Sequence, residues 1–161
     1  MEIISVPAAD LYAFFKTPAA AGAVCPMLVN GTSMQPTLHH LRDTVWLTAL
    51  NRPARRGDIV LFRRKNGQVV LHRVLHAQKG ILEMNGDGQM FTENVPECCA
   101  AALVRRFQRS GKMIDCRAPL YRTYSRLWCA VRPVRPQIFR FCSMWRRLSE
   151  RESSCGKKSK S

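Results

Sequence analysis

One short segment of the chain places a serine where a nucleophile could act. Residues 31–38 read GTSMQPTL and follow an apolar, strand-like run at residues 24–29. Pro36 has a fixed φ and disfavours helical backbone in the residue before it, so Ser33 is expected on a defined bend after a strand. A nucleophilic serine needs such a bend, because its oxygen must face a groove while nearby N–H groups point at the oxyanion that forms. Ser33 is therefore the candidate nucleophile.

A serine is inert without a base, and the chain offers one about forty residues later. His72 lies in the strand-like residues 69–75, which read VVLHRVL. An imidazole, with an ordinary pKa near 6.5, can accept the hydroxyl proton at neutral pH. An acidic turn, NGDG at residues 85–88, follows and brings Asp87. Serine, histidine and aspartate, the residue types of a catalytic triad, then occur in that order, each at the edge of an expected strand.

The elements that must position these side chains are short strands. Runs rich in β-branched and apolar residues, separated by turns, predict a mainly β body. The expected strands cover residues 24–29, 44–50, 58–63, 69–75, 81–84, 100–107 and 112–116. An Asn-Gly pair after the third run predicts a tight hairpin, so residues 59–62 should pair with residues 69–75. A short leading helix is expected at residues 8–16, beside the first strand.

The composition favours one folded domain with a basic extension. A chain of 161 residues, 46% of them hydrophobic, can bury a core without help from metals or disulfides. The net charge is +15, and residues 121–161 carry 11 of the Lys and Arg residues beside two Glu residues. Such a charge favours an acidic partner but says nothing about the fold. Domain boundaries are expected at 1–120 for the body and 121–161 for the extension.

The extension has a composition of its own. Tyr, Trp and Arg predominate after Pro119, and amphipathic helices are expected at residues 120–131 and 137–148. The last dozen residues are rich in Ser and Lys and are expected to be disordered. Interleaved arginines and aromatics also suit peripheral contact with an anionic membrane surface.

The cysteines and the hydropathy pattern bear on the compartment. The seven cysteines lack the C-x-x-C spacing of a zinc site, so they are expected to be reduced, as in the cytoplasm. No apolar run reaches the 18 or so residues that a membrane span needs, and the N-terminus lacks the pattern of a secretory signal. The expected location is cytoplasmic, with the extension as a route to the membrane periphery.

Four motifs together resemble those of the signal peptidase and LexA-like serine peptidase superfamily. They are GTSMQPTL at 31–38, RGDIV at 56–60, HRV at 72–74 and GD at 86–87, in that order. The likeness spans roughly residues 24–116, and it implies a β-rich catalytic domain that cleaves peptide bonds without a metal or other cofactor. Bacterial and mitochondrial members have a lysine as the base, whereas the endoplasmic reticulum and archaeal branch has a histidine. The chain resembles the histidine branch by His72 and the lysine branch by its serine motif.

The third triad residue remains open between two carboxylates. Asp87 is preferred because it occupies the Gly-Asp motif of the family. The histidine branch usually has a second aspartate about six residues further on, and this chain has Glu93 there. A glutamate is one methylene longer and could still reach the imidazole.

The resemblance also implies an oxyanion hole and substrate contacts. Many bacterial relatives have a serine two residues before the nucleophile, where this chain has Gly31. The backbone N–H of Ser33, with Thr32 nearby, is therefore the expected oxyanion donor. Met34 and Pro36 are the expected substrate contacts, although Met34 also suits the core.

The resulting hypothesis is a serine endopeptidase that cleaves a leader or precursor peptide. An alternative is a basic adaptor without turnover that engages an anionic membrane or nucleic acid; nucleic acid is the less favoured partner. A self-cleaving regulator is disfavoured because no helix-turn-helix segment precedes the β body. The sequence leaves the oligomeric state open.

Overall fold

The structure is mainly β. It is a computed structural model that describes residues 6–135 and 137. The strands are β1 (Val24–Leu28), β2 (Thr44–Ala49), β3 (Ile59–Arg63), β4 (Val69–Gln78), β5 (Ile81–Asn85), β6 (Glu93–Pro96), β7 (Ala100–Arg109) and β8 (Lys112–Asp115). The helices are α1 (Ala8–Phe15) and α2 (Pro119–Ala130), with short 3₁₀ turns at Pro18–Ala20, Glu97–Cys99 and Arg132–Val134.

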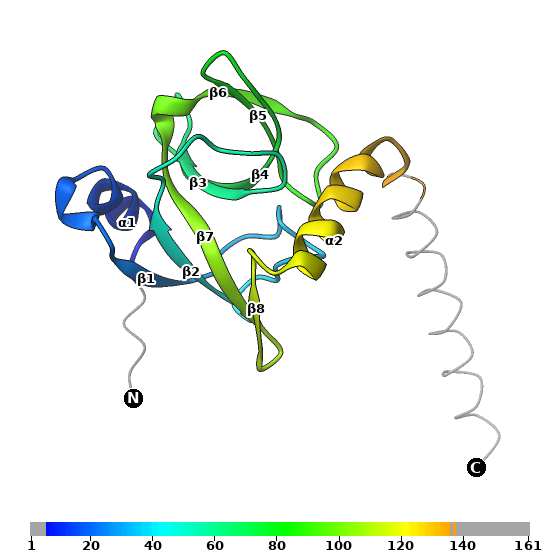
Figure 1. The fold of residues 1–161 in the computed structure, drawn as a ribbon, viewed down its shortest axis with the longest axis horizontal. Helices are drawn as coiled ribbons and strands as arrows, with labels where there is room; N and C mark the ends of the chain where they lie inside the picture. Colours follow the sequence, from blue (N-terminus) through cyan, green and yellow to red (C-terminus); the bar gives the residue numbers. More distant parts are fainter. Residues whose placement is uncertain (1–5, 136, 138–161) are drawn as a thin grey trace, which may run out of the picture. The chain divides into compact units, whose positions relative to one another are not determined.

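The eight strands form one antiparallel sheet. Their order is β1-β2-β7-β3-β4-β5-β6, and β8 pairs with β7 beyond this path. Figure 1 shows that β3 to β6 curve round at one end of the sheet, while β1, β2, β7 and β8 form its other part. As expected, β3 pairs with β4, with Val60 opposite His72 and Leu61 opposite Leu71.

Two apolar cores lie on opposite faces of the sheet, and β3 contributes to both. Ile59 and Leu61 point into the larger core, whereas Val60 and Phe62 point into the smaller one. Successive side chains of a strand point to opposite faces, so a strand buried on both sides has a continuous apolar sequence. This explains why all four residues of the run are at most 2% exposed.

The two helices attach to different parts of the sheet. As expected, a helix covers almost the whole of residues 8–16, and α1 packs against β7, β4 and β3. The first expected helix of the extension is also present as α2. In α2, Tyr121 is buried and packs edge-on against Phe107 of β7, with 5.5 Å between ring centroids.

The chain divides into two compact units, the first ending at Cys129 and the second beginning at Ala130. The helix α2 thus belongs almost entirely to the first unit. The second helix expected in the extension, apart from its first residue, and the last dozen residues lie outside the described residues. Within the described part of the chain, no helix is long and apolar enough to cross a membrane, and the five cysteines there are free thiols.

Candidate functional site

Ser33 lies in the loop between β1 and β2. The loop is closed at its base, where Val29 N–H donates to the Asp43 carbonyl at 2.9 Å and Leu41 N–H donates to the Val29 carbonyl at 2.8 Å. The buried Asp43 carboxylate also accepts from His39 N–H at 2.9 Å. These bonds fix both ends of the loop, and Ser33 lies within it, in a turn that follows the end of β1 at Leu28.

A second turn packs against the backbone of Ser33. Gly88 N–H donates to the Ser33 carbonyl at 2.8 Å. A Cβ atom at Gly86 would stand only 2.6 Å from that carbonyl oxygen, well inside any ordinary contact. Glycine is therefore needed at position 86 because the two backbones approach so closely. The GD motif and the serine motif are thus in direct contact.

The backbone of the serine motif offers donors for an oxyanion. Within the described residues, neither Thr32 N–H nor Ser33 N–H donates a hydrogen bond to another protein atom, and the Ser33 hydroxyl makes none either. Gly31 has φ of +104°, in the region that favours glycine, and its N–H donates to His40 Nδ1 at 2.9 Å. The N–H groups after this bend are free to bind a ligand.

His72 is buried and lies next to a carboxylate. Its side chain is 1% exposed, and Nδ1 lies 2.8 Å from Oε1 of Glu93. The oxygen stands off the direction of the ring N–H, so the pair is a close polar contact and not an aligned hydrogen bond. The strand register explains the proximity, because β4 pairs with β5 and β5 pairs with β6, which begins at Glu93. Nδ1 faces Glu93, and Nε2 is the ring nitrogen that does not.

Arg64 completes a small charged cluster on this side of the sheet. Its Nε and Nη2 each donate to one oxygen of Glu93 at 2.7 Å. Burial lowers the pKa of His72; Glu93 opposes that shift and Arg64 adds to it, so the net direction is down. Burial acts to raise the pKa of Glu93, but Arg64 and His72 outweigh it and lower that pKa overall. The imidazole is therefore neutral, and the carboxylate ionised, at pH 7.

Asp87, the preferred third residue of the triad, has a different partner. It is fully buried and pairs with Arg73, whose Nε and Nη2 donate to its two oxygens at 2.8 and 2.7 Å. Arg73 follows His72 in β4, and neighbouring residues of a strand point to opposite faces. The carboxylate beside the imidazole is Glu93, and Asp87 instead neutralises a buried guanidinium on the other face.

Arg73 is the centre of a buried polar network that the sequence did not indicate. Its Nη1 donates to the Gly57 carbonyl at 3.0 Å, to the Tyr121 hydroxyl at 3.3 Å and to the Ser125 hydroxyl at 2.5 Å. Its Nη2 also donates to the Thr37 hydroxyl at 3.4 Å. We call these residues the Arg73 cluster: Thr37, Gly57, Arg73, Asp87, Tyr121 and Ser125. The cluster joins the turn against Ser33 to helix α2.

The remaining predicted residues have distinct surroundings. Thr32 is exposed beside Ser33, in keeping with an oxyanion role. Met34 is 2% exposed and belongs to the larger core, so it is a packing residue and not a substrate contact. Pro36 is half-buried, and the peptide bond before it is cis.

Comparisons of the chain with protein-family models, with curated proteins and with solved structures gave no match. These comparisons therefore do not bear on the function of the chain.

Proposed function

We propose that the protein is a serine endopeptidase whose nucleophile is Ser33, whose general base is His72 and whose orienting carboxylate is Glu93. The observation that carries the proposal is the contact of Glu93 with Nδ1 of the buried His72, on a sheet whose GD turn binds the Ser33 backbone. The finer fold assignment, to a catalytic domain like that of signal peptidases and LexA-like peptidases, is part of the same proposal.

The chemistry is acyl transfer to serine followed by hydrolysis. His72 Nε2 takes the proton from the Ser33 hydroxyl as the oxygen attacks the peptide carbonyl, and it then gives that proton to the departing amine. The N–H groups of Ser33 and Thr32 stabilise the oxyanion. A water molecule, deprotonated by the same imidazole, then releases the acyl group. The mechanism requires the Ser33 hydroxyl to come within hydrogen-bonding reach of the imidazole in the substrate complex.

The substrate is an extended peptide. Strand β1 ends the strand order, so its outer edge has no partner strand within the described residues. The same strand leads directly to the serine loop. A peptide that pairs with β1 adds a strand to the sheet and passes its backbone carbonyl over Ser33.

A fluorophosphonate probe tests the proposal directly. The intact protein should be labelled once, at Ser33, as located by peptide mass spectrometry, and the label should disappear in Ser33→Ala and His72→Ala. Ser110→Gly and His76→Ala are the matched controls, because both residues are exposed and lie outside the cluster of His72, Glu93 and Arg64. Labelling that persists unchanged in Ser33→Ala would eliminate the peptidase proposal.

A further inference from the structure

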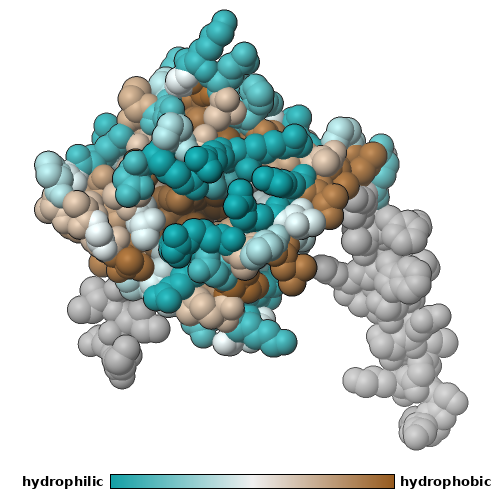
Figure 2. All heavy atoms as spheres, in the orientation of Figure 1, coloured by the Kyte–Doolittle hydropathy of each residue, from teal (hydrophilic) through white to brown (hydrophobic). Residues whose placement is uncertain are grey.

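A second candidate site lies away from Ser33, His72 and Glu93. It is a pocket of about 510 Å³, bounded by β2, the loop before β3, β7 and helix α2. Figure 2 shows a hollow with an apolar floor and a hydrophilic rim on this face of the molecule. Seven arginines line the pocket, which we call the arginine pocket: Arg52, Arg55, Arg56, Arg105, Arg117, Arg122 and Arg126.

Acidic side chains neutralise only part of this charge. Among the described residues, Asp58 is the only carboxylate in the lining, and it pairs with Arg52, whose Nη1 and Nη2 donate to it at 2.8 and 3.1 Å. Arg105 has only a loose contact, 3.6 Å from Asp115. Within the described part of the chain, the other five arginines have no carboxylate within ion-pair distance, and all five are exposed.

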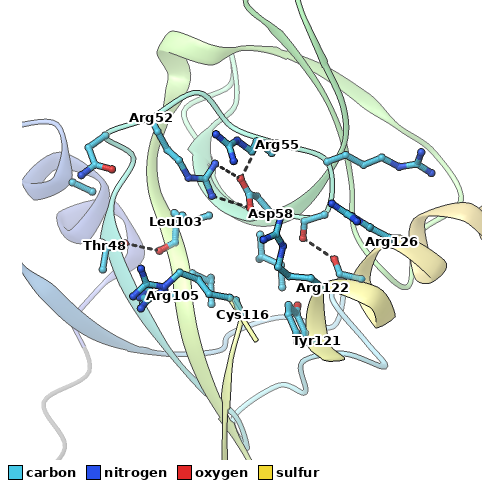
Figure 3. A pocket seen from close by; sticks show the side chains of 18 of the residues that line it. Thr48, Arg52, Arg55, Asp58, Leu103, Arg105, Cys116, Tyr121, Arg122 and Arg126 are labelled. Carbon is cyan, nitrogen blue, oxygen red and sulfur yellow. Dashed lines mark hydrogen bonds and ion pairs between the residues drawn. The ribbon is translucent and has the colours of Figure 1, made fainter. Parts of the chain in front are cut away.

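The free guanidinium groups converge from two directions. Figure 3 shows Arg122 and Arg126 reaching from α2 toward the loop that carries Arg55 and Asp58. Arg105 adds a buried Nη1 atom that makes no aligned hydrogen bond with the protein. Like charges repel, so an arrangement that gathers several of them around one hollow is favoured when an anion occupies it.

The type and spacing of the donors indicate the chemistry of the ligand. A guanidinium is a planar fork that matches two oxygens of a phosphate, and it stays charged at any physiological pH. A single phosphate accounts for at most about two charges, whereas five arginines here have no acidic partner. The pocket volume lies within the range of small-ligand sites, roughly 300 to 1,000 Å³. We propose that the arginine pocket binds a compact anion with two or more linked phosphate groups.

Titration calorimetry of the full-length Ser33→Ala protein tests this, because binding is then measured independently of peptidase activity. The probes are sodium tripolyphosphate, pyrophosphate and phosphate at 150 mM NaCl. We expect one site per chain and at least tenfold tighter binding of tripolyphosphate than of phosphate. Adenosine triphosphate separates two sources of the ligand: tighter binding than tripolyphosphate indicates a nucleotide, and equal or weaker binding indicates an inorganic polyphosphate.

Two double variants make the test specific. Arg122→Gln with Arg126→Gln should weaken tripolyphosphate binding at least tenfold, while leaving the melting temperature without ligand unchanged because both side chains are exposed. Arg109→Gln with Lys112→Gln removes the same charge from the β7–β8 hairpin, outside the pocket, and should change the affinity less than twofold.

Three results would overturn the proposal. Equal weakening by both double variants would mean that the net charge, and not the pocket, attracts the anion. Phosphate binding as tightly as tripolyphosphate would remove the requirement for linked phosphates. Tighter binding of a hexaglutamate peptide than of tripolyphosphate would assign the pocket to acidic peptides instead.

Discussion

The groups around the imidazole of His72 shift its pKa in opposite directions. Burial and Arg64 lower the pKa of His72, whereas Glu93 and, as the smallest effect, Asp87 raise it. Because the net shift is downward, the neutral, basic form persists to a lower pH than for an exposed histidine. The acid limb of the proposed peptidase activity should therefore have its midpoint below pH 6.5.

Substitutions of Glu93 and of Arg64 should shift the pKa of His72 in opposite directions. Glu93→Gln removes the charge that favours the imidazolium and should lower the pKa of His72, whereas Arg64→Gln removes an opposing charge and should raise it. The imidazole nitrogen shifts, followed by NMR against pH, report this without any need for activity. Glu83→Gln, a half-buried acid on β5, is the control and should leave the His72 titration in place. A shift of the His72 pKa in the same direction in both variants would contradict the assigned geometry.

Substitutions of Asp87 and of Glu93 should differ in their effects on the free energy of unfolding. Asp87→Asn leaves the buried Arg73 without its counter-charge, and breaking such a pair costs roughly 3 to 5 kcal/mol. Glu93→Gln should change the free energy of unfolding much less, since Glu93 is partly exposed, yet it should reduce the labelling rate roughly 10³-fold or more. Urea unfolding and probe labelling of the same samples separate the two effects, with Asp10→Asn on the surface of α1 as the control. A stable Asp87→Asn protein would show that Arg73 does not depend on Asp87.

The sequence proposed Ser33 and His72 and left the third residue open between Asp87, which was preferred, and Glu93; in the structure Glu93 is the carboxylate that lies beside His72. Asp87 and Glu93 both follow His72 at distances along the chain that allow contact. The two carboxylates are distinguished by the face of β4 on which each lies. His72 and Arg73 point to opposite faces, and Glu93 lies beside His72 whereas Asp87 pairs with Arg73. A local sequence motif does not show on which face of a curved sheet a carboxylate from a later turn or strand will lie.

At the scale of the element, the GD turn acts on Ser33 through its backbone. A Cβ atom added at Gly86 would stand 2.6 Å from the Ser33 carbonyl oxygen and 2.8 Å from Oε1 of Gln89. Gly86→Ala should push the serine loop away and slow probe labelling roughly 100-fold, as expected for a displacement of about 1 Å at a nucleophile. Unfolding experiments should show a loss of about 1 to 3 kcal/mol, as for other overpacked sites.

Gly67→Ala provides the comparison for Gly86→Ala. Gly67 has φ of +84° in the β3–β4 hairpin, and nothing lies within 4 Å of an added Cβ atom. The change should cost about 1 kcal/mol through backbone strain alone and leave labelling unchanged. If both variants label at the wild-type rate, the GD turn does not position Ser33.

Most strands could be expected from their alternating or continuous apolar patterns, and the β3–β4 pairing followed from its turn. Strand β6 was not expected, because a stretch of four residues that ends in Pro96 lacks a strand signal of its own. Its backbone pairs with β5 only because the chain returns there after the GD turn. Residues 93–96 form a strand because they pair with β5, and this strand carries Glu93.

At the scale of the whole molecule, helix α2 is part of the β body although the sequence placed the boundary at residue 120. Removal of residues 131–161 leaves every described contact of the Arg73 cluster in place, so this truncated chain should still be labelled. A chain that ends at Ala118 loses the hydroxyl partners of Arg73 on Tyr121 and Ser125 and should lose roughly 3 to 6 kcal/mol of stability. Circular dichroism melting and probe labelling of both chains test this. Equal melting temperatures would show that α2 contributes nothing to the body.

The arginine pocket could not be predicted from the sequence. The basic character of the chain was evident, but its strongest concentration was expected in the extension. The lining arginines come from the loop before β3, from β7, from the turn before α2 and from α2 itself. No single segment shows the cluster, because only the packing of α2 beside the sheet brings these residues to one hollow.

The Arg73 cluster also sets the order in which a newly made chain can mature. Ribosomes add Thr37, Gly57, Arg73 and Asp87 well before Tyr121 and Ser125, so the guanidinium acquires its last hydroxyl partners only when α2 emerges. A nascent chain thus carries an incompletely bonded charge beneath the turn that supports Ser33. Under the proposed function, the support of the Ser33 loop is therefore complete only once helix α2 has been made.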